Sequence, residues 1–155
     1  MTSTAPTQPD PTATTTTTTT TTAAVPDGAA LSLEVAGRFV DALAARDFDL
    51  LAGTLADGVH FRALLPSRVL DLDGADAVRS RFARWFGGAE RWEVVEAVVG
   101  EVGGRIHLGW RVRLTDPDIG EGPLLVEQQV YANAGADGRL SDVALLCTGY
   151  RPERS

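Results

Sequence analysis

Residues 55–86 constrain the fold of this chain more than any other stretch, because they predict a strand, a turn and an amphipathic helix in succession. Val59, Phe61 and Ala63 alternate with His60, Arg62 and Leu64, which is the period-two pattern of a strand with one buried face. Pro66 ends this strand, since proline cannot donate a hydrogen bond to the ladder. The buried face of the strand therefore needs a packing partner.

The helix predicted after this strand supplies part of that partner. Asp73 and Gly74 mark its start, and apolar residues then recur at three- and four-residue spacing with arginines largely between them. The apolar stripe consists of Val78, Phe82, Trp85 and Phe86. A strand and one helix cannot bury both of these faces alone, and the only larger candidate surface is the strand-rich second half of the chain.

Composition divides the chain into a tail and one domain. Residues 1–28 are rich in threonine and proline and contain an unbroken threonine run over 14–22. We expect this tail to be disordered, because a segment with so few large apolar side chains cannot offset the entropy lost on ordering. We expect a single domain over residues 29–151.

Charge and cysteine content exclude several classes of partner and site. All fourteen basic residues are arginine against twenty-one acids, and the net charge of -7 argues against nucleic acid as a partner. No apolar run approaches the roughly 18 residues of a membrane span, so no membrane partner is expected. Cys147 is the only cysteine, which favours the cytoplasm. His60 and His107 lack carboxylates at ligand spacing, so we expect no metal and no cofactor.

The remaining elements follow from periodicity and turn residues. Two helices over residues 31–46 and 48–55 precede the first strand, and Asp47 is placed to cap the second. Four strands follow the third helix, over residues 91–101, 105–114, 124–132 and 140–150. Helices gathered before an antiparallel run predict an α+β domain in which a curved sheet wraps the helices.

This order of elements, together with three segments, resembles the NTF2-like superfamily and its SnoaL-like branch over about residues 31–150. The segments are RFVDALAARDFDLLAGTLADGVHF, DGADAVRSRF and VEQQVYANAGADGRL. The resemblance implies an NTF2-like cone, in which a curved antiparallel sheet wraps three helices around an apolar pocket. It also implies a homodimer packed through the sheet. It does not fix function, because this scaffold hosts enzymes, binding modules and transport factors.

Candidate pocket-lining residues follow from the resemblance and from the apolar pattern. They are Phe39, Phe61, Ala63, Phe82, Trp85, Trp110, Gln129 and Tyr131. The alternative for the aromatic members is that they form an ordinary packed core, since aromatic residues dominate any small core.

The catalytic pair of the ketosteroid isomerase-like members is missing from the aligned positions. Phe39 stands where those members have a tyrosine, and Ala63 where they have an aspartate base, so neither oxyanion stabilisation nor proton abstraction is available. The aspartate, arginine, aspartate set of limonene epoxide hydrolase-like members has no clear match either. Glu127 and Asp142 could approach Arg111 only if their strands neighbour it in the right register.

The strand over residues 124–132 decides whether a carboxylate reaches the pocket. One face carries Leu125, Glu127, Gln129 and Tyr131; the other carries Leu124, Val126, Gln128 and Val130. If the first face points inward, Glu127 is the best candidate acid or base, with Asp142 as a second. The second face is the more apolar, which favours Glu127 lying outside.

Two hypotheses of function remain from the sequence. The first, which we favour, is a SnoaL-like domain that binds a small hydrophobic molecule or a partner without the isomerase catalytic pair. The alternative is a polyketide cyclase-like or isomerase-like enzyme that uses one pocket carboxylate, Glu127 or Asp142, as acid and base.

Overall fold

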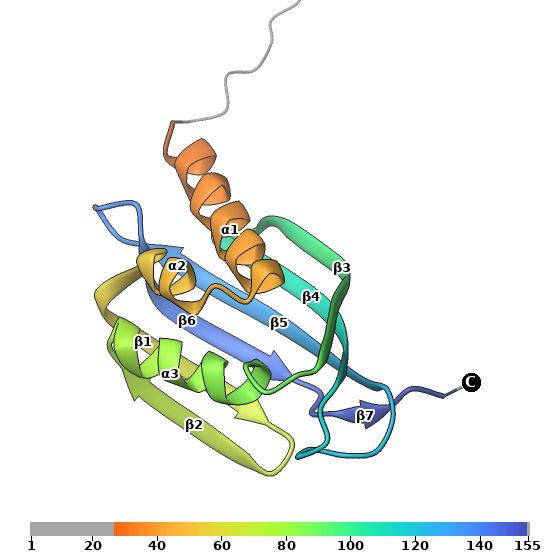
Figure 1. The fold of residues 1–155 in the computed structure, drawn as a ribbon. Coiled ribbons are helices and arrows are strands. Elements are labelled where there is room, and N and C mark those ends of the chain that lie inside the picture. Colours follow the sequence, from red (N-terminus) through yellow and green to blue (C-terminus); the bar gives the residue numbers. More distant parts are fainter. Residues whose placement is uncertain (1–26, 155) are drawn as a thin grey trace, which may run out of the picture.

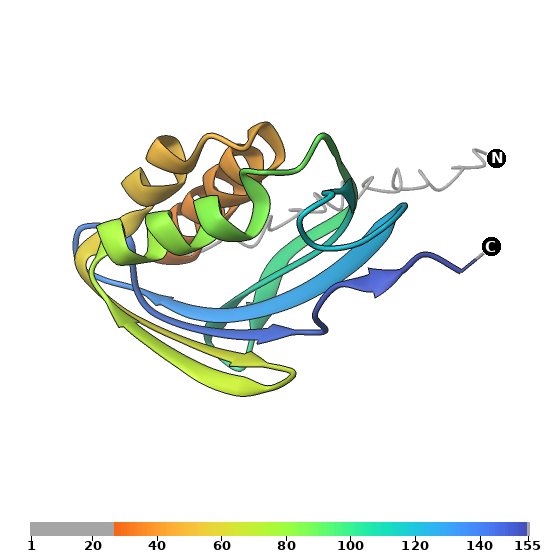
Figure 2. The same ribbon diagram turned by 60° about the horizontal axis from the view of Figure 1, so that its bottom comes forward.

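The computed structural model describes residues 27–154, which form three helices and a seven-stranded sheet (Figure 1). The helices are α1 (Asp27–Ala45), α2 (Phe48–Gly53) and α3 (Ala75–Phe86). The strands are β1 (Leu55–Leu65), β2 (Arg68–Asp73), β3 (Arg91–Val102), β4 (Arg105–Thr115), β5 (Leu124–Ala134), β6 (Leu140–Cys147) and β7 (Arg151–Pro152). All three helices lie against one face of the curved sheet, and the other face is uncovered by them (Figure 2).

The sheet has the strand order β2-β1-β6-β5-β4-β3, and β7 pairs with β5. Every neighbouring pair is antiparallel except β1 with β6, which run parallel. The expected α+β class and the curved sheet around the helices are confirmed. Within residues 27–154, no helix combines the length and hydropathy needed to cross a membrane.

Strand β2 is the element that the sequence analysis missed, since a turn was expected between Pro66 and Asp73. It pairs with β1 through a two-residue connection, Leu65 opposite Arg68. Leu70 and Leu72 are half-buried, while the other four residues of the strand are exposed and three of them are charged. A charged edge strand with only half-buried apolar residues gives a weak pattern, which explains the omission. Most of the predicted tail lies outside the described residues.

Other boundaries differ by a few residues from those expected. Helix α1 begins at Asp27, helix α2 ends at Gly53, and the last long strand ends at Cys147. The predicted cap of α2 is present: the Asp47 carboxylate accepts a hydrogen bond from the Leu50 N–H at 2.9 Å.

A cluster of aromatic rings joins the helices to the sheet. Its members are Phe39 of α1, Phe61 of β1, Phe82 and Phe86 of α3, and Trp110 of β4, all fully buried. Phe82 is the centre of this aromatic cluster, because its ring lies 5.8 to 6.4 Å from the rings of the other four. The predicted alternation of β1 and the apolar stripe of α3 thus converge on one core, and Trp85 of the stripe is half-buried at its edge.

Replacing Phe82 with alanine tests this role. We expect Phe82→Ala to lower the free energy of unfolding by about 3–5 kcal/mol, because it removes a fully buried ring and leaves a cavity between α3 and the sheet. Urea denaturation followed by circular dichroism measures the loss. Leu50→Ala, at an exposed position of α2, is the control and should change stability by less than about 0.5 kcal/mol. A loss below about 1 kcal/mol for Phe82→Ala would contradict the central role of this ring.

Candidate functional site

A cavity of about 290 Å³ opens at one end of the layer between α3 and the sheet. We call it the inner pocket. Residues 65–68 of the β1–β2 hairpin form one side and Trp85 and Phe86 of α3 another. Inward-facing residues of β5 and the chain at and beyond the end of β6 complete it: Val126, Gln128, Cys147, Gly149 and Tyr150.

Gln128 is the buried polar group of this pocket, with only 1% of its surface exposed. Its Oε1 accepts a hydrogen bond from the Trp110 indole N–H at 2.9 Å, and its Nε2 donates to the Cys147 Sγ at 3.3 Å. The Gly149 backbone N–H donates to the same sulfur at 3.3 Å. Because both ends of the amide are bonded, its orientation is fixed and it presents a neutral polar surface.

Tyr150 anchors the chain that closes the pocket. Its hydroxyl donates to the backbone carbonyl of Trp85 at 2.6 Å. Burial raises the pKa of Tyr150, so the hydroxyl stays protonated and keeps donating this hydrogen bond. Gly149 before it has a φ of +73°, and a Cβ there would lie 2.8 Å from Pro66 Cγ. Glycine therefore allows the end of β6 to lie against the β1–β2 hairpin.

The predicted lining residues fall into three places. Trp85 lines the inner pocket. Phe39, Phe61, Ala63, Phe82 and Trp110 are at most 1% exposed and pack behind it in the core, which is the alternative weighed for the aromatic members. Gln129 and Tyr131 lie on the outer face of the sheet, where they contact His107. They are outside because β5 buries the opposite set, Leu124, Val126, Gln128 and Val130.

Of the residues that line the inner pocket, only Trp85 was in the predicted set; Gln128, Cys147 and Tyr150 are among those that were not. The period of β5 offered a signal for Gln128, because it is the only polar member of the more apolar face. Cys147 and Tyr150 gave no comparable signal, since they reach the pocket only through the pairing of β6 with β5 and the turn at Gly149.

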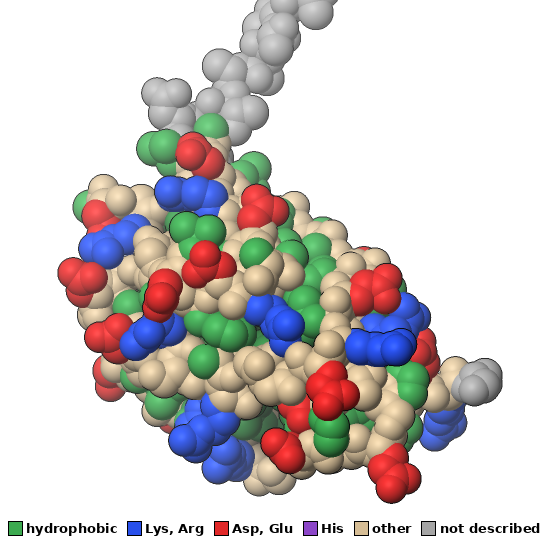
Figure 3. Space-filling model, viewed as in Figure 1, with side chains coloured by type: hydrophobic (Ala, Val, Ile, Leu, Met, Phe, Trp, Pro, Cys, Tyr) green, Lys and Arg blue, Asp and Glu red, His purple; other side chains and the backbone are tan. Residues whose placement is uncertain are grey.

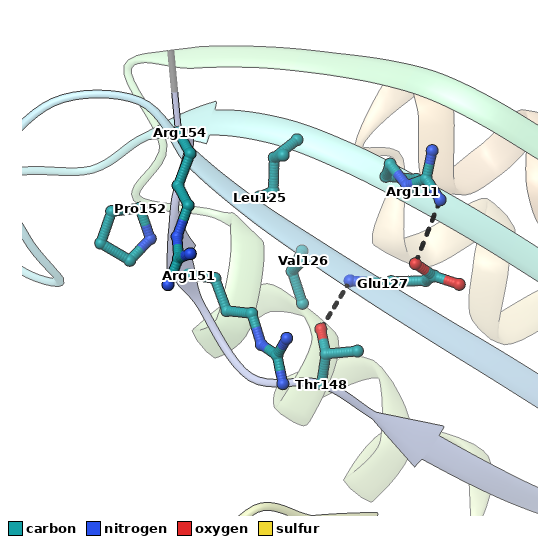
Figure 4. Close-up of a pocket in the computed structure, with 8 residues that line it drawn as sticks. All are labelled: Arg111, Leu125, Val126, Glu127, Thr148, Arg151, Pro152 and Arg154. Atoms are coloured by element: carbon teal, nitrogen blue, oxygen red, sulfur yellow. Dashed lines mark hydrogen bonds and ion pairs between the residues drawn. The ribbon is translucent and has the colours of Figure 1, made fainter.

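A second and larger hollow, of about 700 Å³, lies on the outer face of the sheet near the start of β5 (Figure 4). We call it the outer hollow. Arg111, Leu125, Val126, Glu127, Thr148, Arg151, Pro152 and Arg154 line it. The C-terminal residues that form one wall of the outer hollow are anchored by Arg113. Its guanidinium donates to the Glu153 carboxylate at 2.7 Å and lowers the pKa of that carboxyl.

Glu127 lies in the outer hollow and points at Arg111 (Figure 4). The two side chains form an ion pair at 3.3 Å, and the Glu127 backbone N–H donates to the Thr148 hydroxyl at 3.0 Å. Arg111 also pairs with Glu96 at 3.2 Å. The Glu127 side chain is 39% exposed, so its carboxylate is both paired and in contact with water.

Asp142 is the other predicted catalytic carboxylate, and it also lies away from the inner pocket. Its Oδ2 accepts a hydrogen bond from Arg105 at 3.4 Å, and its side chain is 49% exposed. Asp142 stands opposite Asn133 in the sheet, whereas Arg111 stands opposite Glu127. The structure therefore brings Glu127, but not Asp142, to Arg111, and it brings neither carboxylate into the inner pocket.

The fold and the inner pocket define an α+β domain of the NTF2-like type. Residues 36–143 match the sequence profile of the SnoaL-like domain, and the chain belongs to this family. A comparison with curated proteins found no match.

Solved structures share the fold. Bal32a from a soil-derived mobile gene cassette has a TM-score of 0.62 and 20% identity, covering 79% of this chain and 93% of its own. A protein from Xanthomonas campestris pv. campestris with a suggested polyketide cyclase activity has a TM-score of 0.62 and 16% identity, covering 77% of this chain and 91% of its own. An epoxide hydrolase of the LEH-like type from M. tuberculosis has a TM-score of 0.57 and 17% identity, covering 77% of this chain and 84% of its own. At these identities the likeness concerns the fold alone.

The hydrogen bond between Gln128 and Trp110 can be tested by a double-mutant cycle. We expect Gln128→Leu to destabilise the protein by about 1–3 kcal/mol, because it leaves the buried Trp110 N–H without an acceptor. In a Trp110→Phe background, the same change should cost clearly less. Chemical denaturation of the four proteins measures the coupling. Gln129→Leu, on the outer face, is the neighbouring control. Equal costs of Gln128→Leu in both backgrounds would show that the bond does not support the pocket.

Proposed function

We propose that this SnoaL-like domain binds a small, largely apolar molecule in the inner pocket. A volume of about 290 Å³ is just below the range of about 300–1,000 Å³ that is usual for ligand sites, so the ligand is small. Trp85 and Leu65, which are half-buried, offer apolar contact surface, and the lining also includes the buried Phe86 ring and the neutral, buried Gln128 amide. This combination of apolar walls and few polar groups is typical of small-molecule sites.

One observation carries the proposal of binding without the isomerase chemistry: the lining of the inner pocket contains no Asp or Glu. The two positions that carry the isomerase pair are occupied by Phe39 and Ala63, which are buried in the core. A general base needs a group that accepts a proton near neutral pH within reach of the bound molecule. Neither a carboxylate nor a histidine lines this pocket.

Catalysis by Glu127 or Asp142 remains the alternative, with less support from the geometry. Both carboxylates lie on the outer face in ion pairs with arginine and are partly exposed to water. Neither side chain is buried away from water.

The homodimer implied by the family resemblance is also a proposal. A row of paired residues crosses the outer face from Leu64 and Leu146, through Gln129 and Gly109, to Val98. Leu64, Leu146 and Val98 are exposed, as expected of a surface that a second copy would cover.

A pocket-filling variant tests the binding proposal. We expect 2-naphthol, a neutral probe of suitable size, to bind the protein saturably in isothermal titration calorimetry. Cys147→Phe should weaken this binding by at least about tenfold, because the new ring occupies the pocket. Leu146→Phe adds the same ring one residue earlier, on the opposite face, and should leave the affinity unchanged.

Further variants make the outcome decisive. Glu127→Gln should not change binding of 2-naphthol, since Glu127 lies outside the inner pocket. Circular dichroism checks that Cys147→Phe is folded; if it is not, Trp85→Ala, which removes one wall, replaces it. Absence of saturable binding by the unmodified protein, or equal losses for the variants at residues 146 and 147, would contradict the proposal.

A further inference from the structure

The inner pocket opens beside a group of three arginines, Arg68, Arg81 and Arg84. Arg68 itself lines the pocket, at the first position of β2. Arg81 precedes Trp85 by one helical turn of α3, so these two side chains lie on the same side of the helix. Arginine side chains gather below α3, over the β1–β2 hairpin (Figure 3).

None of these three arginines has an ion-pair partner among residues 27–154. Arg79, on the other side of α3, is paired with Asp49 at 2.9 Å, so the helix does not lack acidic neighbours in general. Partial burial lowers the pKa of Arg81, and repulsion by Arg84 and Arg68 lowers it further. Arg81 is thus repelled by two arginines, and none of the three charges is neutralised by an ion pair among the described residues.

A ligand with a negative charge would relieve this repulsion. The chain as a whole carries a net charge of -7, which disfavours the approach of anions, so a local positive group at a pocket mouth is a specific feature. Guanidinium groups bind carboxylates through paired hydrogen bonds, and partial burial strengthens such contacts. The apolar walls next to Arg68, formed by Trp85 and Leu65, suit the uncharged remainder of the same molecule.

We infer that the inner pocket binds a small organic anion, an apolar body with one carboxylate. The apolar body lies between Trp85, Phe86 and Leu65, and the carboxylate lies at the mouth beside Arg68 and Arg81. This inference rests on the proposed binding function and adds the charge of the ligand to it.

The experiment compares 2-naphthoate with 2-naphthamide, which has the same shape and no charge. In isothermal titration calorimetry at low ionic strength, the unmodified protein should bind 2-naphthoate about tenfold more tightly than 2-naphthamide. Arg68→Gln and Arg81→Gln should each reduce this preference about threefold or more, while the affinity for 2-naphthamide stays the same. Raising the salt concentration should weaken binding of the anion only.

Arg62→Gln is the matched control, because Arg62 is an exposed arginine on the outer side of β1 with no ion pair among the described residues. Its preference for 2-naphthoate should equal that of the unmodified protein. Equal affinities for the acid and the amide would overturn the inference and leave the proposed function intact. An equal effect of Arg62→Gln and Arg68→Gln would also overturn it, since it would indicate a general effect of charge. Failure of both probes to bind would contradict the proposed function itself.

Discussion

The packing of Phe82 against the sheet is the interaction on which the rest of the structure depends. This one ring contacts aromatic side chains from α1, β1 and β4, so it joins elements that are far apart in the sequence. The same packing sets the distance between α3 and the sheet. Trp85, three residues further along the helix, is thereby held at the edge of the core, where it forms a wall of the inner pocket. Core packing and pocket formation are two results of the same helix placement.

Much of the fold could be predicted because two periodic patterns are strong in this chain. The alternation in β1 and β4 and the stripe of α3 identify buried faces from local spacing alone. Strand β2 was not predicted because an edge strand needs only one half-buried face and tolerates charged residues. The parallel pairing of β1 with β6 could not be read either, since strand order is a property of distant segments and leaves no local signal.

The site was harder to predict than the fold for the same reason. Periodicity showed that the face of β5 with Glu127 is the less apolar one, and the structure places that face outside. It did not identify where the packing leaves an opening, which depends on how Gln128, Cys147 and Tyr150 meet residues of the β1–β2 hairpin and α3. Of the predicted aromatic lining residues, Phe39, Phe61, Phe82 and Trp110 are buried in the core, and Trp85 lines the inner pocket.

The position of β6 has a consequence for how the chain folds. This strand lies between β1 and β5, although it is the last long strand in the sequence. Until it is present, the sheet consists of two separate parts, the β1–β2 hairpin and the β3–β4–β5 meander, which have no strand in common. During synthesis the two parts can therefore join only after β6 has been made, and joining them requires contacts between distant segments, which are slow to form. The exposed strand edges of both parts are the sites at which an incomplete chain would aggregate.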